Sequence, residues 1–273
     1  MSTLLQQITE ATDFIKQQYK EMPVAGIILG SGLGNFTGEI EIEKEIAYGD
    51  IPHFPVSTVK GHGGKMVFGT LGGKKVVCMA GRFHFYEGYT AQQATFPVRV
   101  MKALGAEILL LTNAAGGVQQ GFKVGDLMII NDHISFFTTN PLIGKNEDSL
   151  GTRFPDMSEP YNKELIAKAK KIAGEEGYEV KEGVYVAVTG PTFETHAEYR
   201  FIKTMGGDAV GMSTVQEAIV AAHGGMKVFA MSVITDLGIR EDDNVITHEE
   251  VLAAAKEAEP KLTTIFKRMV AEL

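Results

Sequence analysis

The sequence contains almost no cysteine, since Cys78 is the only one in 273 residues. A disulfide within the chain and a zinc site built on cysteines are therefore excluded. Basic residues are outnumbered, because 26 Lys and Arg stand against 34 Asp and Glu, and they form no cluster. The resulting net charge of -8 argues against nucleic acid and against an anionic membrane as partners.

No apolar run approaches the length of a membrane span, and the N-terminus has no signal-peptide core, so we expect a cytoplasmic protein. Hydrophobic residues make up 44% of the chain and charged residues 22%, which is typical of a globular protein with a substantial core. No linker, repeat or shift in composition divides the chain. We therefore predict a single domain over residues 1–273.

Apolar runs with the character of buried strands alternate with segments of helical spacing, and this alternation is typical of an α/β fold. The strands are predicted at 24–29, 66–71, 74–79, 107–111, 124–131, 184–188, 209–212 and 227–233. The helices are predicted at 3–19, after residue 90, at 162–176, at 218–223 and from residue 247. Capping boxes indicate helix starts at Thr3, Thr90, Thr195 and Ser213. We expect an irregular helix start near Pro97 and an interrupted helix at Pro260.

Residues 81–89 form a polar stretch directly after the predicted strand 74–79. If this stretch stays extended, Arg82, His84 and Tyr86 point to one side, because side chains two apart share a face. A cation, an imidazole and a phenol on one face could bind a phosphate next to a sugar. The alternative is a surface loop that its two Phe side chains anchor.

The sequence has two glycine clusters, and the first could bring the backbone close to an anion. Residues 30–34 follow the first predicted strand, but Asn35 occupies a position where the dinucleotide fingerprint needs glycine or alanine. The second cluster, residues 61–65, does not fit the P-loop, because Met66 stands where that motif needs Ser or Thr. A tight turn with positive φ explains the glycines of the first cluster almost as well.

Other polar residues also stand at strand ends and helix starts. Residues 112–117 follow a predicted strand, Glu194 precedes a helix start, and Ser213 is a predicted N-cap. Helix-dipole complementation for Glu194 and simple capping for Ser213 remain alternatives. Taken together, the residues indicate an α/β enzyme that binds a small, partly anionic ligand along one edge of its sheet and needs no metal.

Six segments carry a family resemblance, and they occur in the order GSGLG (30–34), GHG (61–63), GRFHFYEGY (81–89), TNAAGG (112–117), GPTFET (190–195) and GMST (211–214). From about residue 24 to His248 the chain resembles the trimeric purine nucleoside phosphorylases. The resemblance implies an α/β fold with a mixed, partly barrel-like central sheet flanked by helices. It also implies a homotrimer that cleaves purine (deoxy)ribonucleosides with inorganic phosphate as co-substrate, in purine salvage, without a cofactor or metal.

The resemblance assigns roles to individual residues of this sequence. The phosphate site would comprise Ser31, Arg82, His84, Ser213 and the backbone at Ala114, with His62 covering it. The ribose site would comprise Tyr86, Met212, His248 and Phe154, the last contributed to a neighbouring subunit. The base site would comprise Phe193, Glu194 and Asp236, and the catalytic residues would be His84, Glu194 and Asp236.

Glu194 and Asp236 favour different purine substrates. An ionised Glu194 would accept the N1–H of hypoxanthine or guanine and would reject adenine, which has no hydrogen at N1. Asp236, however, stands where the 6-oxopurine enzymes have Asn, and methylthioadenosine phosphorylases use an Asp near that position. We expect a preference for inosine and guanosine. The alternatives are an adenosine-type or broad-specificity phosphorylase and a non-catalytic nucleoside sensor.

Overall fold

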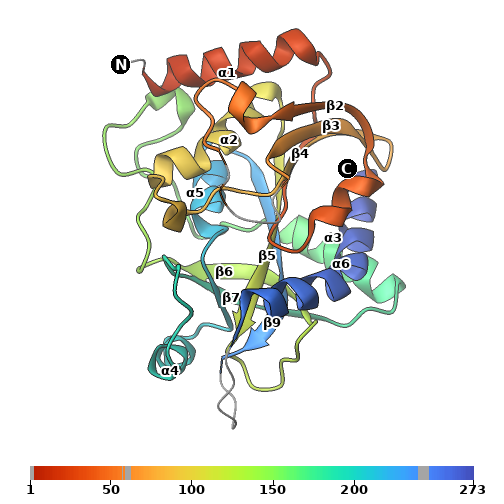
Figure 1. The fold of residues 1–273 in the computed structure, drawn as a ribbon, viewed down its shortest axis with the longest axis vertical. Helices are drawn as coiled ribbons and strands as arrows, with labels where there is room; N and C mark the ends of the chain where they lie inside the picture. The colour runs from red at the N-terminus through yellow and green to blue at the C-terminus, as the bar shows by residue number, and fades with distance from the viewer. Residues whose placement is uncertain (1–2, 57, 59–62, 239–245) are drawn as a thin grey trace.

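The computed structural model describes residues 3–56, 58, 63–238 and 246–273, and Figure 1 shows the course of the chain. The strands are β1 (Ala25–Ile28), β2 (Glu41–Ala47), β3 (Lys65–Leu71), β4 (Lys74–Ala80), β5 (Ile108–Gly117), β6 (Leu127–Ile134), β7 (Val180–Ala187), β8 (Ala209–Gly211) and β9 (Lys227–Leu237). The α-helices are α1 (Leu4–Gln18), α2 (Ala91–Leu104), α3 (Lys163–Glu175), α4 (His196–Thr204), α5 (Val215–His223) and α6 (His248–Ala271).

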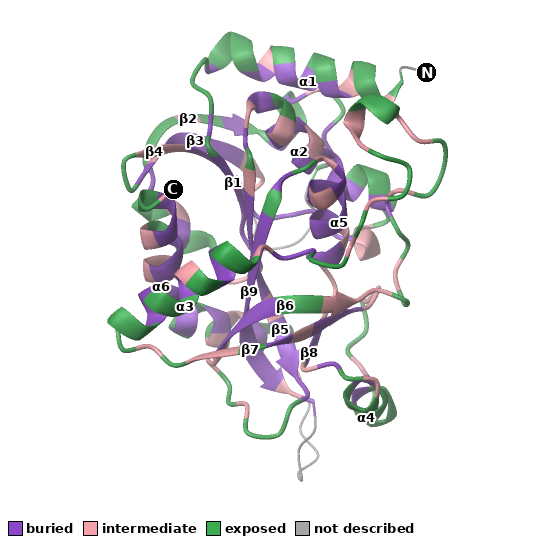
Figure 2. Ribbon diagram, turned by 180° about the vertical axis from the view of Figure 1, so that it is seen from behind, coloured by how far each residue is buried: buried purple, intermediate pink, exposed green. Residues whose placement is uncertain are grey.

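The described strands form one mixed sheet in the order β2-β3-β4-β1-β5-β8-β7-β6-β9, and β9 also pairs with β5. This last pairing closes β5, β8, β7, β6 and β9 into a ring, while β2, β3, β4 and β1 extend from β5 as an open sheet. The predicted mixed, partly barrel-like sheet is therefore confirmed. Figure 2 shows that the strands at the centre of the molecule are mostly buried.

Helices cover the sheet on two sides (Figure 1). Helix α2 packs against α1 and α5 on one side, and α6 packs against α3 and β9 on the other. The apolar faces of these helices explain the arrangement, because each buries aliphatic side chains at helical spacing, as Ile8, Ala11 and Ile15 do in α1. The capping boxes predicted at Thr3, Thr90 and Thr195 are confirmed, and Thr247 forms a further one.

The parallel pairing of four strands explains where a ligand can bind. Strand β1 is parallel to both β4 and β5, and β5 is parallel to β9. The carboxyl ends of these four strands therefore meet at one edge of the sheet, which is the position where open α/β sheets bind ligands. The residues that follow β1 and β4, and the last residues of β5 and β9, are the ones that the sequence analysis singled out.

Three expectations about the elements were wrong. The segment 112–117 does not follow a strand but belongs to β5, which pairs with β9 along its whole length. Helix α6 continues through Pro260, and α2 continues through Pro97 without a break. Each proline removes one backbone hydrogen bond, but burial of the flanking residues offsets that loss: Phe96 and Val98 in α2, and Ala258 and Leu262 in α6.

The sequence does not predict strand β2. Its residues are nearly all exposed, and Ile46 is the one fully buried side chain in it, so no clear alternation of apolar and polar residues marks it as a strand. Its pairing with β3 decides its conformation. Strand β6 also begins three residues later than expected and extends through the polar pair Asp132 and His133.

Candidate active site

A cavity of about 400 Å³ lies at the shared carboxyl edge of β1, β4, β5 and β9. Its size falls in the range of small-molecule sites. Among the predicted site residues it is lined by Ser31, Arg82, His84, Tyr86, Ala114, Phe193, Glu194, Met212, Ser213, Asp236 and His248. Residues from seven separate segments of the sequence thus meet at one place.

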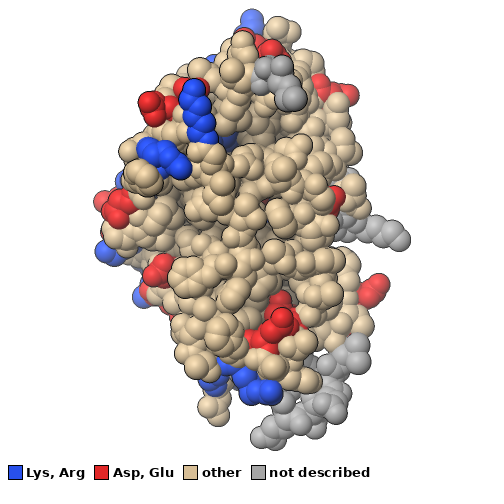
Figure 3. Space-filling view, turned by 90° about the vertical axis from the view of Figure 1, so that its left-hand side faces the viewer, with Lys and Arg blue, Asp and Glu red and all other residues tan. Residues whose placement is uncertain are grey.

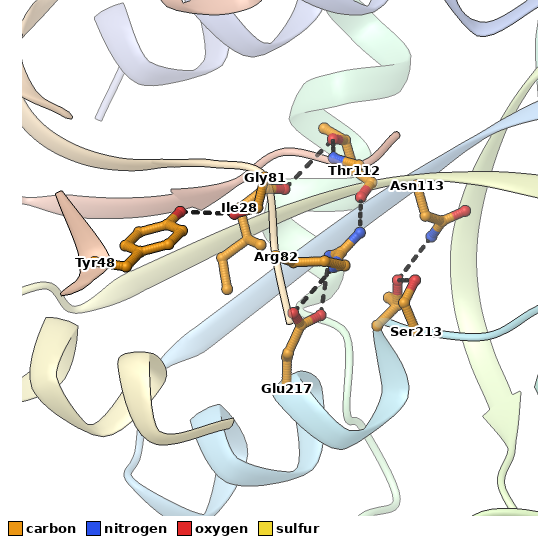
Figure 4. A network of polar contacts seen from close by, with 10 residues as sticks. Ile28, Tyr48, Gly81, Arg82, Thr112, Asn113, Ser213 and Glu217 are labelled. Carbon is orange, nitrogen blue, oxygen red and sulfur yellow. Dashed lines mark hydrogen bonds and ion pairs between the residues drawn. The ribbon is translucent and has the colours of Figure 1, made fainter. Parts of the chain in front are cut away.

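Arg82, which lines the cavity, is held by a buried ion pair with Glu217 (Figure 4). Its Nε donates to Glu217 Oε1 at 3.0 Å, its Nη2 donates to Oε2 at 2.9 Å, and its Nη1 donates to the carbonyl of Thr112. The side chains of Arg82 and Glu217 are only 1% and 7% exposed. The bidentate geometry fixes the plane of the guanidinium group, so that its position relative to an anion in the cavity is set before the anion binds.

His84 is oriented by Glu87. The Oε1 of Glu87 lies 3.1 Å from His84 Nδ1 and accepts the backbone N–H of the same histidine at 2.8 Å. Burial lowers the pKa of His84, and the nearby Glu87 carboxylate only partly opposes this. Burial would raise the pKa of Glu87, but hydrogen bonds from His84 and Thr58 outweigh it and lower that pKa to about 2. Glu87 is therefore ionised and fixes the imidazole ring.

Only part of the stretch 81–89 is extended in the structure, whereas the sequence analysis considered all of it as extended. Residues Phe85–Glu87 form a turn of 3₁₀ helix. Tyr86 nevertheless lies on the same side as His84, because their rings stack with centroids 4.6 Å apart. The turn brings Glu87 back to His84, which an extended chain could not do because their side chains would point to opposite faces. Arg82, His84 and Tyr86 all line the cavity.

Ser213 is not the N-cap of α5, contrary to the predicted capping box. The N-cap is Thr214, which has φ 75° and makes no capping hydrogen bond through its side chain. This left-handed conformation is costly for a β-branched residue. The side-chain amide of Asn113 holds Thr214 in place by donating to its Oγ1 at 2.9 Å. The strained turn directs Ser213 into the cavity instead of onto the helix.

The glycine turn after β1 lies against β5. A Cβ at Gly30 would lie 2.7 Å from the Cα of Asn113, so only glycine permits this approach. Gly32 has φ 77°, as a tight turn with positive φ requires. Ser31 stands between these two glycines and lines the cavity. The turn thus places Ser31 close to β5, on the same cavity as Arg82.

Two carboxyl groups line the other part of the cavity. Asp236, at the end of β9, is 5% exposed, and its Oδ1 accepts a hydrogen bond from Thr235 at 3.2 Å. Glu194 precedes α4, and burial raises its pKa, as do Asp236 and Glu198 to a smaller extent. Tyr199, a buried residue of α4, donates to Asp236 Oδ2 at 3.5 Å. The two acids line the cavity, and the Tyr199 phenol, which does not line it, completes the cluster.

One described site residue, Phe154, does not line this cavity. Phe154 is 84% exposed and contacts the guanidinium of Arg153, which lies 5.2 Å from its ring centroid. It lines a separate surface hollow. His62 lies outside the described residues. In the described part of the chain, no group of three or more His, Cys, Asp or Glu side chains could hold a metal ion, and no helix has the length and apolar character to cross a membrane.

Sequence reasoning gave no role to Glu217, Glu87, Asn113, Thr214 or Tyr199, all of which shape the site. A signal existed only for Glu87, which stands three residues after His84 and could cap the turn that contains it. The other contacts join residues 37 to 135 positions apart in the chain. Periodicity and capping rules relate only residues that are close in the sequence, so they do not predict these contacts.

Comparisons with known proteins agree with this geometry. The sequence pattern of the Phosphorylase superfamily matches residues 24–271. Purine nucleoside phosphorylase 1 of Bacillus subtilis is 54% identical over 265 residues, which cover 97% of this chain and 98% of that protein. The structure of Schistosoma mansoni purine nucleoside phosphorylase in complex with adenosine is 40% identical, with a TM-score of 0.94 over 100% of this chain and 99% of that chain. A structure from the same organism in complex with inosine is 39% identical, also with a TM-score of 0.94, over 100% and 98% of the two chains.

Proposed function

The chain belongs to the phosphorylase superfamily and is a pentosyltransferase that acts on purine nucleosides, and we propose that it prefers inosine and guanosine. In this reaction an oxygen of inorganic phosphate forms a bond to C1′ of the sugar while the bond from C1′ to the purine breaks. The products are the free base and (deoxy)ribose 1-phosphate. We place the reaction in purine salvage, in a cytoplasmic enzyme that works as a single domain and needs phosphate but no cofactor.

In our proposal the phosphate binds near Arg82. The guanidinium group, the His84 imidazole and the Ser31 and Ser213 hydroxyls all line the same cavity, together with the backbone at Ala114. His62, which lies outside the described residues, would cover the phosphate. A bound phosphate dianion both attacks C1′ and stabilises the positive charge that develops on the sugar, so positioning and electrostatics account for the rate. The rigid Arg82–Glu217 pair supports this role, because its geometry is set before phosphate binds.

The sugar would lie between the phosphate and the base, against Tyr86, Met212 and His248. Met212 packs over Gly190, where a Cβ would lie 2.3 Å from its Sδ, so Gly190 leaves room for the thioether. His248, the first residue of α6, also lines the cavity. These three side chains offer an apolar surface and two hydrogen-bonding groups, which suits a pentose.

The purine would lie against Phe193, between Glu194 and Asp236. The leaving base carries negative charge unless it is protonated or hydrogen-bonded, so the groups that face N7 and O6 matter. We propose that ionised Glu194 accepts the N1–H of a 6-oxopurine and that Asp236 donates a proton or hydrogen bond to N7 or O6 during part of the cycle. The carboxyl cluster in the cavity is the single observation that carries the substrate preference.

We also propose a homotrimer in which Phe154 reaches the sugar site of a neighbouring subunit. A Phe that is 84% exposed costs hydration free energy unless another surface covers it. Phe136, Phe137 and Ile143 of the same connection after β6 are also exposed. The side of the molecule that carries this connection and α4, seen face-on in Figure 3, has a broad central area with few charged side chains.

One assay tests the function and the preference together. The purified protein is incubated with inosine or adenosine, each with and without inorganic phosphate, and the released base and sugar phosphate are quantified. We expect phosphate-dependent release of hypoxanthine and a higher kcat/KM for inosine. Faster cleavage of adenosine would favour the adenosine-type alternative, which Asp236 supports, and binding without any cleavage would favour the nucleoside sensor.

A further inference from the structure

We propose that Tyr199 is a positioning residue for the purine end of the cavity, whose hydroxyl holds Glu194 and Asp236 in the arrangement that favours a purine with N1–H over adenine. The proposal rests on the proposed function of the same cavity. Tyr199 is not among the residues that line the cavity, so it would act through the two carboxyl groups and not by touching the substrate.

The location of Tyr199 is set by tight packing on both sides of the cluster. The residue is 2% exposed and lies one turn into α4, whose start is fixed by the capping box of Thr195 and Glu198. A Cβ at Gly238 would lie 2.1 Å from the Tyr199 ring, and a Cβ at Gly116 would lie 2.9 Å from Asp236 Oδ2. Neither the ring nor the carboxyl group has room to move toward those glycines.

The Tyr199 hydroxyl has one hydrogen and two neighbouring acceptors, the carboxylates of Asp236 and Glu194. It donates to Asp236 Oδ2 at 3.5 Å and also interacts with the Glu194 carboxylate. Burial first, and then Asp236 and Glu194, raise the pKa of Tyr199 well above its ordinary value, so the phenol remains a donor at any working pH. The long contact in the ligand-free protein is expected for a site that tightens when its substrate binds.

The Tyr199 hydroxyl also favours the charged form of Glu194. Burial raises the pKa of Glu194, and the described charged groups that face it, Asp236 on β9 and Glu198 on α4, raise it further. Two hydrogen bonds act in the opposite direction and lower the pKa of Glu194: first the one from its own backbone, and then the one from the Tyr199 hydroxyl. Ionised Glu194 accepts the N1–H of inosine, whereas protonated Glu194 would donate to the unprotonated N1 of adenosine. Loss of the hydroxyl should therefore shift the preference toward adenosine.

The test compares Tyr199→Phe with Tyr161→Phe. Both changes remove one hydroxyl from a buried ring, but the Tyr161 hydroxyl contacts His133 Nδ1 at 3.1 Å and does not line the cavity. In Tyr199→Phe we expect the acidic limb of kcat/KM for inosine to move up by about one pH unit, the size of one hydrogen bond to a charged group. The ratio of inosine to adenosine cleavage at the acid end should then fall about tenfold, and Tyr161→Phe should keep the wild-type profile.

A second measurement does not depend on catalysis. NMR of ¹³C-labelled Glu side chains, assigned with Glu194→Gln, follows the titration of Glu194 in the ligand-free protein, and Tyr199→Phe should raise its midpoint. An unchanged midpoint, or an equal loss of inosine and adenosine cleavage at every pH, overturns the role of Tyr199. Failure of the wild type to cleave inosine with phosphate would instead refute the proposed function, and the NMR titration would still decide the coupling.

Discussion

The substitution Glu217→Gln tests the origin of the rigid phosphate site. It keeps the shape of the side chain but removes the charge that pairs with Arg82, and it turns an amide N–H₂ toward one of the guanidinium donors. Because the two side chains are 1% and 7% exposed, solvent cannot replace the lost carboxylate. Breaking a buried pair of this kind costs roughly 3–5 kcal/mol. For a chain of this size that corresponds to a fall in Tm of roughly 6–20 °C.

Phosphate should partly reverse this loss. An anion in the cavity can pair with the Arg82 charge that the variant leaves uncompensated, so phosphate binding should stabilise the variant more than the wild type. The measurement is thermal unfolding of both proteins at increasing phosphate concentration, together with steady-state kinetics. We expect a larger phosphate-dependent rise in Tm for Glu217→Gln. We also expect a fall in kcat, because the guanidinium is no longer held in one plane.

Glu259→Gln is the matched control. Glu259 is also a buried carboxylate, 3% exposed, but it accepts hydrogen bonds from the backbone of Phe36 and the amide of Asn35, both at 2.9 Å. Within the described residues it pairs with no cation. Its substitution should lower Tm without changing the response to phosphate. If Glu217→Gln unfolded at the wild-type temperature, or if phosphate stabilised it less than the wild type, the reasoning about the Arg82–Glu217 pair would be refuted.

Four further substitutions test individual roles. Arg82→Ala and His84→Ala should each raise the phosphate KM or lower kcat by ten- to about a hundredfold, because a charge-assisted hydrogen bond contributes roughly 1.5–3 kcal/mol. If steady-state kinetics gave unchanged values for both variants, the phosphate site would be contradicted. Phe154→Ala should raise the nucleoside KM without unfolding the subunit, and full activity of a verified monomer at high dilution would exclude a contribution across subunits. Asp236→Asn should retain inosine cleavage, because an amide can still donate a hydrogen bond. It should, however, shift the alkaline limb of the profile of kcat/KM for inosine against pH. If the alkaline limbs of the variant and the wild type coincided, Asp236 would carry no proton that the reaction needs.

The sequence by itself determined the features that depend on near neighbours in the chain. The capping boxes at Thr3, Thr90 and Thr195 formed as predicted, because their hydrogen bonds join residues three positions apart. Most of the strands were predicted from continuous apolar runs, since strands covered on both faces need apolar side chains throughout. The parallel order of these strands then brought the residues at their carboxyl ends to one cavity, which the alternation of strands and helices had indicated.

Tertiary structure alone decided the details on which the chemistry depends. Glu217 pairs with Arg82 across 135 positions, and Tyr199 contacts Asp236 across 37. Ser213 met the sequence rule for an N-cap, yet the contact between Asn113 and Thr214 moves the helix start by one residue and directs Ser213 into the cavity. Local preferences differ by about 1 kcal/mol or less, whereas leaving one partner of a buried charge pair unpaired costs roughly 3–5 kcal/mol. Long-range packing therefore prevails wherever the two disagree.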